Sequence, residues 1–229
     1  MFLTTDNNIL WRRMVWGALV TLCLVLIGIC CLDERIYMLT ANVNDWNLWR
    51  ILGRVFDAKL WLLVTAIVFA VYGLKRFVKT IESIKNRKIQ FRFMDILKET
   101  YVKTKTSNAF LIFSSVFCAS VLVWVLKVIF ARLRPVFVMS GQIPEFDRFA
   151  WAWHSMPSGH TTVTFAGLVM IGMLAPRYKP FTWTLAVIVG LSRICIGAHW
   201  FSDVILGAFI GMVVADIVKW VFMKKLAKA

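Results

Sequence analysis

Three short segments in the second half of the chain combine cations, histidines and a carboxylate at spacings that could support chemistry on a phosphate group. In chain order, the residues of interest are Lys127, Arg134, Ser158, Gly159, His160, Arg193, His199 and Asp203. Arginine grips phosphate through paired N–H donors, whereas lysine acts as a point charge. Unpaired N–H groups at a helix start, expected here at Pro157 or Ser158, also bind anions. The set therefore predicts a phosphate-binding site.

Two histidines and a carboxylate beside these cations could carry out phosphoryl transfer. A neutral ring nitrogen of His199 could attack phosphorus. Asp203 follows four residues later, on the same face of a helix, and would accept the other ring N–H and fix the tautomer. His160 could protonate the departing oxygen and then activate a water against the phosphohistidine. Each residue alone has an ordinary structural explanation, but together they predict a catalytic site.

Other details of the same segments have structural interpretations. Lys127 and Arg134 are two helical turns apart, so a helix that continues to Pro135 would turn both in one direction. Arg132 is expected to point toward lipid headgroups. His154 has no partner that the sequence assigns, and we interpret it as a loop residue.

The elements that must position these residues are long apolar segments. Of 229 residues, 60% are hydrophobic and 17% charged, against about 45–50% and 25% in soluble domains, which argues against a soluble globular protein. The candidate spans are Met14–Leu32, Lys59–Leu74, Ala109–Phe130, Thr161–Ala175, Phe181–Gly197 and Phe201–Met223. We therefore expect an all-α, polytopic bundle of six transmembrane helices, with residues 1–229 as one domain. The five cysteines fall within or at the ends of these spans and are expected to be buried.

The net charge of +15 predicts the orientation of the bundle. The loop 75–108 holds ten basic and three acidic residues, and the other basic flanks fall on its side of the membrane. The positive-inside rule places this loop and both termini in the cytoplasm, and the three motif segments on the opposite side. Because the loop alternates apolar and basic residues, an amphipathic helix on anionic lipid is favoured over a nucleic-acid patch. Ile36–Ala58, on the opposite side, has the composition of short interfacial helices.

The three segments resemble the tripartite signature of the type 2 phosphatidic acid phosphatase family. The matching motifs are Lys127-x6-Arg134-Pro135, Pro157-Ser158-Gly159-His160 and Ser192-Arg193-x5-His199-x3-Asp203. Every motif position is filled, and the match covers residues 127–203, whereas residues 1–108 carry no family motif. The resemblance implies a membrane phosphatase that needs neither a metal nor a cofactor and forms a covalent phosphohistidine.

The resemblance also implies roles for individual residues. His199 would be the nucleophile, Asp203 its orienting partner and His160 the general acid and base. The phosphate-binding residues would be Lys127, Arg134, Ser158, Gly159 and Arg193, with Ser158 and Gly159 acting partly through the backbone. Family members of this size and topology are commonly bacterial inner-membrane enzymes that act at the periplasmic face. Their substrates include undecaprenyl pyrophosphate, phosphatidylglycerol phosphate, phosphatidic acid and lipid A.

Two other functions stay open at this point. A lipid phosphotransferase would use the same phosphohistidine and replace water by a lipid acceptor. A transporter or scramblase of anionic lipids would use the cations for binding alone and leave the histidines idle. The family's soluble haloperoxidases are disfavoured by six spans. The motifs specify neither the lipid nor an oligomeric state.

Overall fold

The structure is a computed structural model that describes residues 2–4, 8–41, 47–87, 93–105 and 107–226. Its α-helices are α1 (Trp11–Ile27), α2 (Asp33–Thr40), α3 (Asn47–Val55), α4 (Ala58–Arg87), α5 (Phe93–Lys105), α6 (Asn108–Phe130), α7 (Pro135–Ser140), α8 (Gly159–Leu174), α9 (Lys179–Cys195) and α10 (Phe201–Leu226). A π-helical turn, η1 (Gly28–Leu32), joins α1 to α2, and two 3-10 turns, η3 (Trp151–Trp153) and η4 (Pro176–Tyr178), precede α8 and α9. Apart from one bridge between Leu3 and Ile9, the described residues form no β-structure, so the predicted all-α fold is confirmed.

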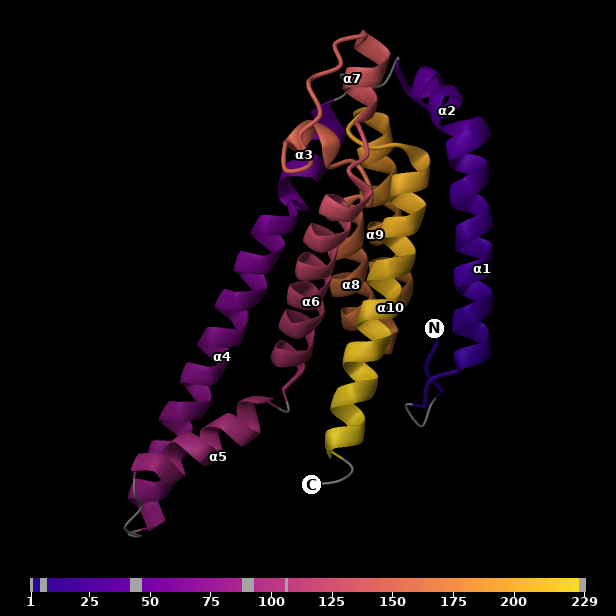
Figure 1. Cartoon of the computed structure of the whole chain (residues 1–229). Helices are drawn as coiled ribbons and strands as arrows, with labels where there is room; N and C mark the ends of the chain where they lie inside the picture. Colours follow the sequence, from indigo (N-terminus) through magenta and orange to yellow (C-terminus); the bar gives the residue numbers. More distant parts are fainter. Residues whose placement is uncertain (1, 5–7, 42–46, 88–92, 106, 227–229) are drawn as a thin grey trace.

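Helix α8 is the centre of the bundle and packs against α6, α9 and α10 (Figure 1). Most of its residues are buried, including Val163, Val169 and Met170. Helix α10 approaches it closely because Gly211 lacks a side chain: a Cβ there would lie 2.4 Å from the carbonyl oxygen of Thr162. The helix that carries His160 is therefore held firmly by its neighbours.

Four helical stretches are long and apolar enough to cross a membrane: Trp11–Thr40, Ala58–Ser83, Asn108–Ser140 and Phe201–Lys224. Helix α8 is shorter, with 16 residues, and α9 has 17. At 1.5 Å per residue, 16 residues extend about 24 Å, less than a hydrocarbon core of about 30 Å. The six-span count therefore stays a prediction for these two helices.

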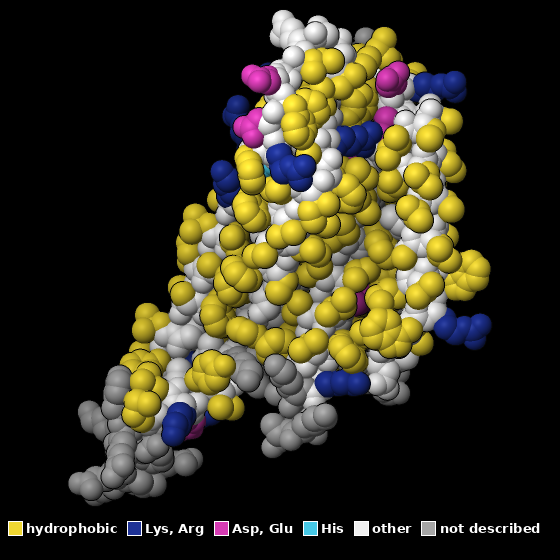
Figure 2. All heavy atoms as spheres, viewed as in Figure 1, with side chains coloured by type: hydrophobic (Ala, Val, Ile, Leu, Met, Phe, Trp, Pro, Cys, Tyr) yellow, Lys and Arg dark blue, Asp and Glu magenta, His cyan; other side chains and the backbone are white. Residues whose placement is uncertain are grey.

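On the face shown in Figure 2, apolar side chains cover most of the side of the bundle, and several charged groups lie toward its ends. Exposed valines and leucines on α1, α4 and α6 contribute to this surface. Our expectation that the cysteines are buried is wrong for Cys23, Cys30, Cys31 and Cys118, which are exposed, whereas Cys195 is partly buried. Outer helices bury only one face in protein, so an apolar residue within a span need not be buried by the chain itself.

The predicted loop 75–108 is largely helical where it is described. Helix α4 continues to Arg87 and α5 covers Phe93–Lys105, while residues 88–92 and 106 lie outside the described part. Within Ile36–Ala58, α2 and α3 supply the expected short helices, and residues 42–46 lie outside the description. Helix α5 lies at the end of the bundle where α1 begins and α10 ends, opposite α3 and α7 (Figure 1).

Candidate active site

The segment that carries Lys127 and Arg134 is not one continuous helix. Helix α6 ends at Phe130, because Ala131 adopts a left-handed conformation with φ of 41°. Pro135 begins α7 rather than ending α6, as suits a residue without an N–H. The chain between the two helices folds over the end of the bundle, where the Arg134 N–H donates to the Ala152 carbonyl at 2.9 Å. The helix thus ends at Phe130, as the predicted span does, and does not continue to Pro135, yet both cations face one cavity.

That cavity, which we call the catalytic cavity, has a volume of about 420 Å³. Predicted site residues that line it are Lys127, Arg134, Gly159, His160 and His199. Ser158 and Asp203 are fully buried behind its wall, and Arg193 lines an adjacent cavity. Segments that are far apart in the sequence therefore meet at one end of the bundle, as the alternating topology of the predicted spans suggested.

His199 presents one ring nitrogen to the cavity. Its Nδ1 lies 2.8 Å from the carbonyl oxygen of Ser155. Because a carbonyl only accepts hydrogen bonds, Nδ1 carries the proton and the lone pair resides on Nε2. This Nε2 lies 3.4 Å from Nη1 of Arg134. The arrangement leaves a nucleophilic nitrogen beside a cation that can hold the phosphate.

Asp203 orients His199 less directly than the sequence predicted. Helix α10 begins at Phe201, so His199 precedes the helix, and its Nδ1 is 3.7 Å from Oδ2 of Asp203. That oxygen accepts instead from the Ser155 hydroxyl at 2.5 Å and from the Trp200 N–H at 2.9 Å. The expected direct acceptance of the ring N–H is therefore wrong. Ser155 stands between the two residues, with its hydroxyl on the carboxylate and its carbonyl on the imidazole.

Arg132 does not point toward lipid headgroups, contrary to our expectation. Its Nη2 is 2.6 Å from Oδ2 of Asp33, and its Nη1 is 2.6 Å from Oδ1 of Asp203. Ser202 completes the cluster, since its N–H donates to Oδ1 of Asp33 at 2.9 Å. Two carboxylates buried at one place require a cation, and Arg132 supplies it.

Lys127 and Arg134 share a backbone acceptor. The Nζ of Lys127 and the Nη2 of Arg134 both donate to the carbonyl of His154, the second at 3.1 Å. Arg134 also donates to the carbonyls of Trp151 and Ala198 at 3.0 and 2.8 Å. The ring of His154, for which we assigned no partner, lies with its Nε2 2.9 Å from the Arg148 carbonyl. His154 thus helps to position both cations.

His160 is paired with a carboxylate that sequence reasoning missed. Its Nε2 lies 3.2 Å from Oδ2 of Asp57, in the turn between α3 and α4. The other oxygen of Asp57 accepts from the N–H groups of Lys59 and Leu60 at 2.9 and 3.3 Å, and so caps α4. An aspartate before an apolar run is a recognisable helix cap, but nothing in the sequence relates it to a histidine about a hundred residues later.

The start of α8 brings the remaining predicted residues to the cavity. Ser158 is the N-cap residue, as expected, although its hydroxyl accepts from the Thr161 hydroxyl at 2.9 Å and does not cap the helix. A Cβ at Gly159 would lie 3.5 Å from Cε of Lys127. The backbone at Gly159 therefore lines the catalytic cavity next to a cation.

The electrostatic surroundings keep His199 neutral. Burial, followed by the nearby Arg134 cation, lowers the pKa of His199 well below its ordinary value of 6.5. A neutral imidazole with its proton on Nδ1 is the form that can attack phosphorus. In the described part of the chain, no three His, Cys, Asp or Glu side chains gather as a metal site. Independence from metals stays a prediction.

Comparison with known proteins identifies a family to which the chain belongs. Residues 108–227 match the family model of the PAP2 superfamily. The chain belongs to the PAP2 superfamily. A lipid A 1-phosphatase of Rhizobium johnstonii is 29% identical over 214 residues, which cover 88% of this chain and 81% of that protein. No solved structure is a significant match.

Two further relatives match over shorter segments. A lipid A 4'-phosphatase of Porphyromonas gingivalis is 32% identical over 107 residues, covering 42% of this chain and 43% of that protein. An undecaprenyl-diphosphatase of Sulfolobus acidocaldarius is 35% identical over 98 residues, covering 41% of this chain and 45% of that protein.

The PAP2 segment contains all eight predicted site residues but not all the residues that support them. Asp33 and Asp57, which pair with Arg132 and His160, precede residue 108. This PAP2 protein therefore builds its site from both halves of the chain. Only the second half carries a motif by which the sequence could reveal it.

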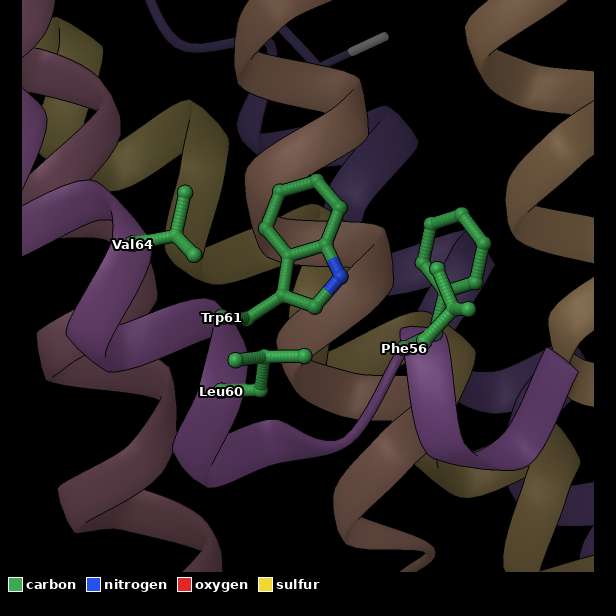
Figure 3. A pocket seen from close by; sticks show the side chains of 5 residues that line it. Phe56, Leu60, Trp61 and Val64 are labelled. Atoms are coloured by element: carbon green, nitrogen blue, oxygen red, sulfur yellow. The ribbon is translucent and has the colours of Figure 1, made fainter. Parts of the chain in front are cut away.

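A separate hollow beside α4 has an apolar lining. Val55, Phe56, Leu60, Trp61 and Val64 enclose about 350 Å³, and Figure 3 shows the rings of Phe56 and Trp61 facing this space. The two rings are stacked with centroids 5.7 Å apart. This lining contains no titratable side chain.

Proposed function

We propose that the chain is an integral membrane phosphatase, with residues 1–229 as one domain, that hydrolyses the phosphomonoester or pyrophosphate of a lipid through a phosphohistidine. The observation that carries this proposal is the catalytic cavity. Nε2 of His199, Lys127 and Arg134 line it together with Leu62 of α4 and Val123 of α6. A site with cations at one end and apolar side chains along its wall fits a phosphate attached to a hydrocarbon.

In the first step, Nε2 of His199 attacks phosphorus while the bond to the lipid oxygen breaks. His160 donates its proton to that oxygen, and the Ser155 carbonyl holds the Nδ1 proton of the imidazolium that forms. Asp57 orients His160 for this transfer and stabilises its protonated form. Lys127, Arg134 and Arg193 interact with the phosphoryl oxygens as their charge shifts.

In the second step, His160 accepts a proton from a water molecule, which attacks the phosphohistidine. The phosphorus–nitrogen bond breaks, orthophosphate is released, and His199 returns to its neutral form. The Ser155–Asp203 contact keeps the ring in the same orientation through both steps, because it fixes the carbonyl that binds Nδ1.

The names of the relatives support a substrate of the lipid phosphate class. Trp124 on α6 and Leu62 on α4 line the catalytic cavity, and the outer faces of these two helices are apolar. We propose that the substrate resides in the bacterial inner membrane and reacts at the periplasmic face. On the cytoplasmic side, the basic segment 75–108 would contact anionic lipid.

The decisive test is phosphate release from lipid substrates in mixed micelles by the purified protein with EDTA present. We expect activity under these conditions and its loss in His199→Ala, with an acid-labile phosphoenzyme in the wild type alone. Arg35→Ala, an exposed change on α2, is the matched control and should retain activity. A requirement for a divalent metal, or activity that survives His199→Ala, would contradict the mechanism. Phosphate that appears on an added lipid acceptor would identify a phosphotransferase.

A further inference from the structure

A second cavity adjoins the catalytic cavity and carries its own cations. It has a volume of about 440 Å³ and is lined by Arg50, Gly53, Arg54, Asp57, His160, Arg193 and Ile196. Asp57 and His160 line both cavities, so the two spaces meet at the proposed general acid. We call this space the α3 subsite, because α3 supplies Arg50 and Arg54.

The α3 subsite has a buried guanidinium at its base. Arg193 is only 8% exposed, and its Nε has no hydrogen-bond partner in the described part of the chain. A Cβ at Gly53 would lie 2.5 Å from its Nη1, so the absence of a side chain at position 53 allows α3 to pack on Arg193. A buried donor without a partner is costly, and an anion in the subsite would satisfy it.

The lining of the α3 subsite holds more guanidinium groups than carboxylates. Arg50 and Arg54 are four residues apart on one face of α3, a spacing at which like charges destabilise a helix. The lone carboxylate of the lining, Asp57, is already paired with His160 at 3.2 Å. Apart from this engaged carboxylate, the ionisable side chains that line the subsite with His160 are guanidinium groups, including the buried Arg193, which favours a ligand that carries negative charge.

In the proposed mechanism the reacting phosphate is bound by Lys127 and Arg134, which line the catalytic cavity, and by Arg193, which lines the adjoining α3 subsite. The cations of α3 are additional to them and belong to no motif of the PAP2 segment, which begins at residue 108. A mono-phosphorylated headgroup has no group that would need them. A headgroup with a second anionic group beside the reacting phosphate would use both cavities at once.

We propose that the α3 subsite binds a second phosphate of the lipid headgroup and so makes the enzyme selective for substrates with two phosphates. This proposal rests on the proposed function, since the reacting phosphate occupies the catalytic cavity. The second phosphate could be directly bonded to the first, as in a lipid diphosphate, or attached elsewhere on a larger headgroup, as in a bis-phosphorylated disaccharide lipid.

The test compares Arg50→Gln/Arg54→Gln with wild type on two matched pairs of substrates. One pair is a polyprenyl diphosphate and the polyprenyl monophosphate with the same chain. The other is a disaccharide lipid with two phosphates and the same lipid with one. For each pair we divide kcat/KM for the lipid with two phosphates by kcat/KM for the lipid with one. We expect this ratio to be about tenfold lower in the double variant than in wild type for one of the two pairs, because hydrogen bonds to a charged group are lost. Arg35→Ala, an arginine on α2 outside both cavities, is the matched control and should keep the wild-type ratios.

The pair in which the ratio falls identifies the source of the second phosphate. Inhibition by inorganic anions provides a readout that does not depend on the lipid. Inorganic diphosphate should inhibit wild type more strongly than orthophosphate does. If the kcat/KM ratio falls for the polyprenyl pair, the double variant should be inhibited equally by the two anions. An equal fall for all four lipids would mean that α3 merely attaches to the membrane surface, and it would overturn the proposal. Unchanged ratios would overturn it too. Wild-type protein that hydrolyses none of the four lipids would instead refute the proposed function.

Discussion

At the scale of single residues, the site depends on groups that no motif contains. Ser155 connects Asp203 to His199 through two different atoms, and Asp57 connects α4 to His160. The motif residues were predictable because cations, histidines and a carboxylate recur at spacings that suit phosphate chemistry. Their partners were not, because a serine or aspartate in a polar segment has many possible roles, and only tertiary contacts select one.

Asp57→Asn should lower kcat by about ten- to a hundredfold, with a smaller effect on KM, because Asp57 orients the general acid rather than the phosphate. Steady-state kinetics on a lipid phosphate in micelles measures both constants. The control is Asp147→Asn, which changes an exposed loop residue outside both cavities and should leave kcat and KM at their wild-type values. An unaltered kcat in Asp57→Asn would show that His160 acts without this carboxylate.

The lowered pKa of His199 predicts a dependence of stability on pH. In the unfolded chain the imidazole takes up a proton near its ordinary pKa of 6.5, whereas in the folded protein it does so only at lower pH. The unfolded state therefore binds more protons as the pH falls below 6.5, and folding loses stability there, while above 6.5 the group has no effect. Thermal unfolding in detergent should show that Tm falls more between pH 7.5 and pH 5 in wild type than in His199→Gln. Equal losses in the two proteins would contradict this assignment.

At the scale of helices, hydropathy predicted where helices occur better than where they end. The predicted span Ala109–Phe130 ends where α6 ends, whereas α4 continues to Arg87, well beyond the predicted end of its span at Leu74. The central place of α8 was equally hidden, because an apolar helix surrounded by protein has the same hydropathy as one surrounded by lipid. Its near-complete burial emerges only from the contacts with α6, α9 and α10.

Gly211→Ala should destabilise the protein, because the added methyl group would lie 2.4 Å from the Thr162 carbonyl and 2.7 Å from Cβ of Phe165. Overpacking of this kind costs about 1–3 kcal/mol, which corresponds to a Tm lowered by roughly 2–12 °C at this chain length. Gly73→Ala is the matched control on α4, where the nearest atom, Cγ2 of Thr104, is 3.5 Å away. Alanine there should preserve or raise Tm, since it favours helix. If the Gly211→Ala variant had the same Tm as the Gly73→Ala variant, the result would contradict the close packing of α8 and α10.

At the scale of the whole molecule, the catalytic cavity and the basic segment lie at opposite ends of the bundle. Helices α3 and α7 border the site, whereas α5, the start of α1 and the end of α10 lie at the other end (Figure 1). The charge bias of the sequence predicts that the second end faces the cytoplasm. The fold class could be predicted from composition alone, but the pairing of the first two long helices with the motif-bearing part could not.

Single cysteines in a cysteine-free background would test this orientation. Gln142 follows α7 and is exposed, and Ser83 is exposed near the far end of α4. We expect an impermeant maleimide to label Gln142→Cys on intact bacterial cells and Ser83→Cys only after the membrane is permeabilised. The reverse pattern would place the site on the cytoplasmic face.

The pairing of Arg132 with Asp33 has a consequence for exchanging parts between relatives. A chimera that joined residues 1–107 of one parent to residues 108–229 of another would inherit the two charges from different sources. Removing one partner of a buried ion pair typically costs about 3–5 kcal/mol, so such a hybrid would fold poorly wherever the parents differ at either position. The segment that defines the superfamily therefore cannot be exchanged between relatives by itself. A stable hybrid requires that the residues at positions 33 and 132 come from the same parent.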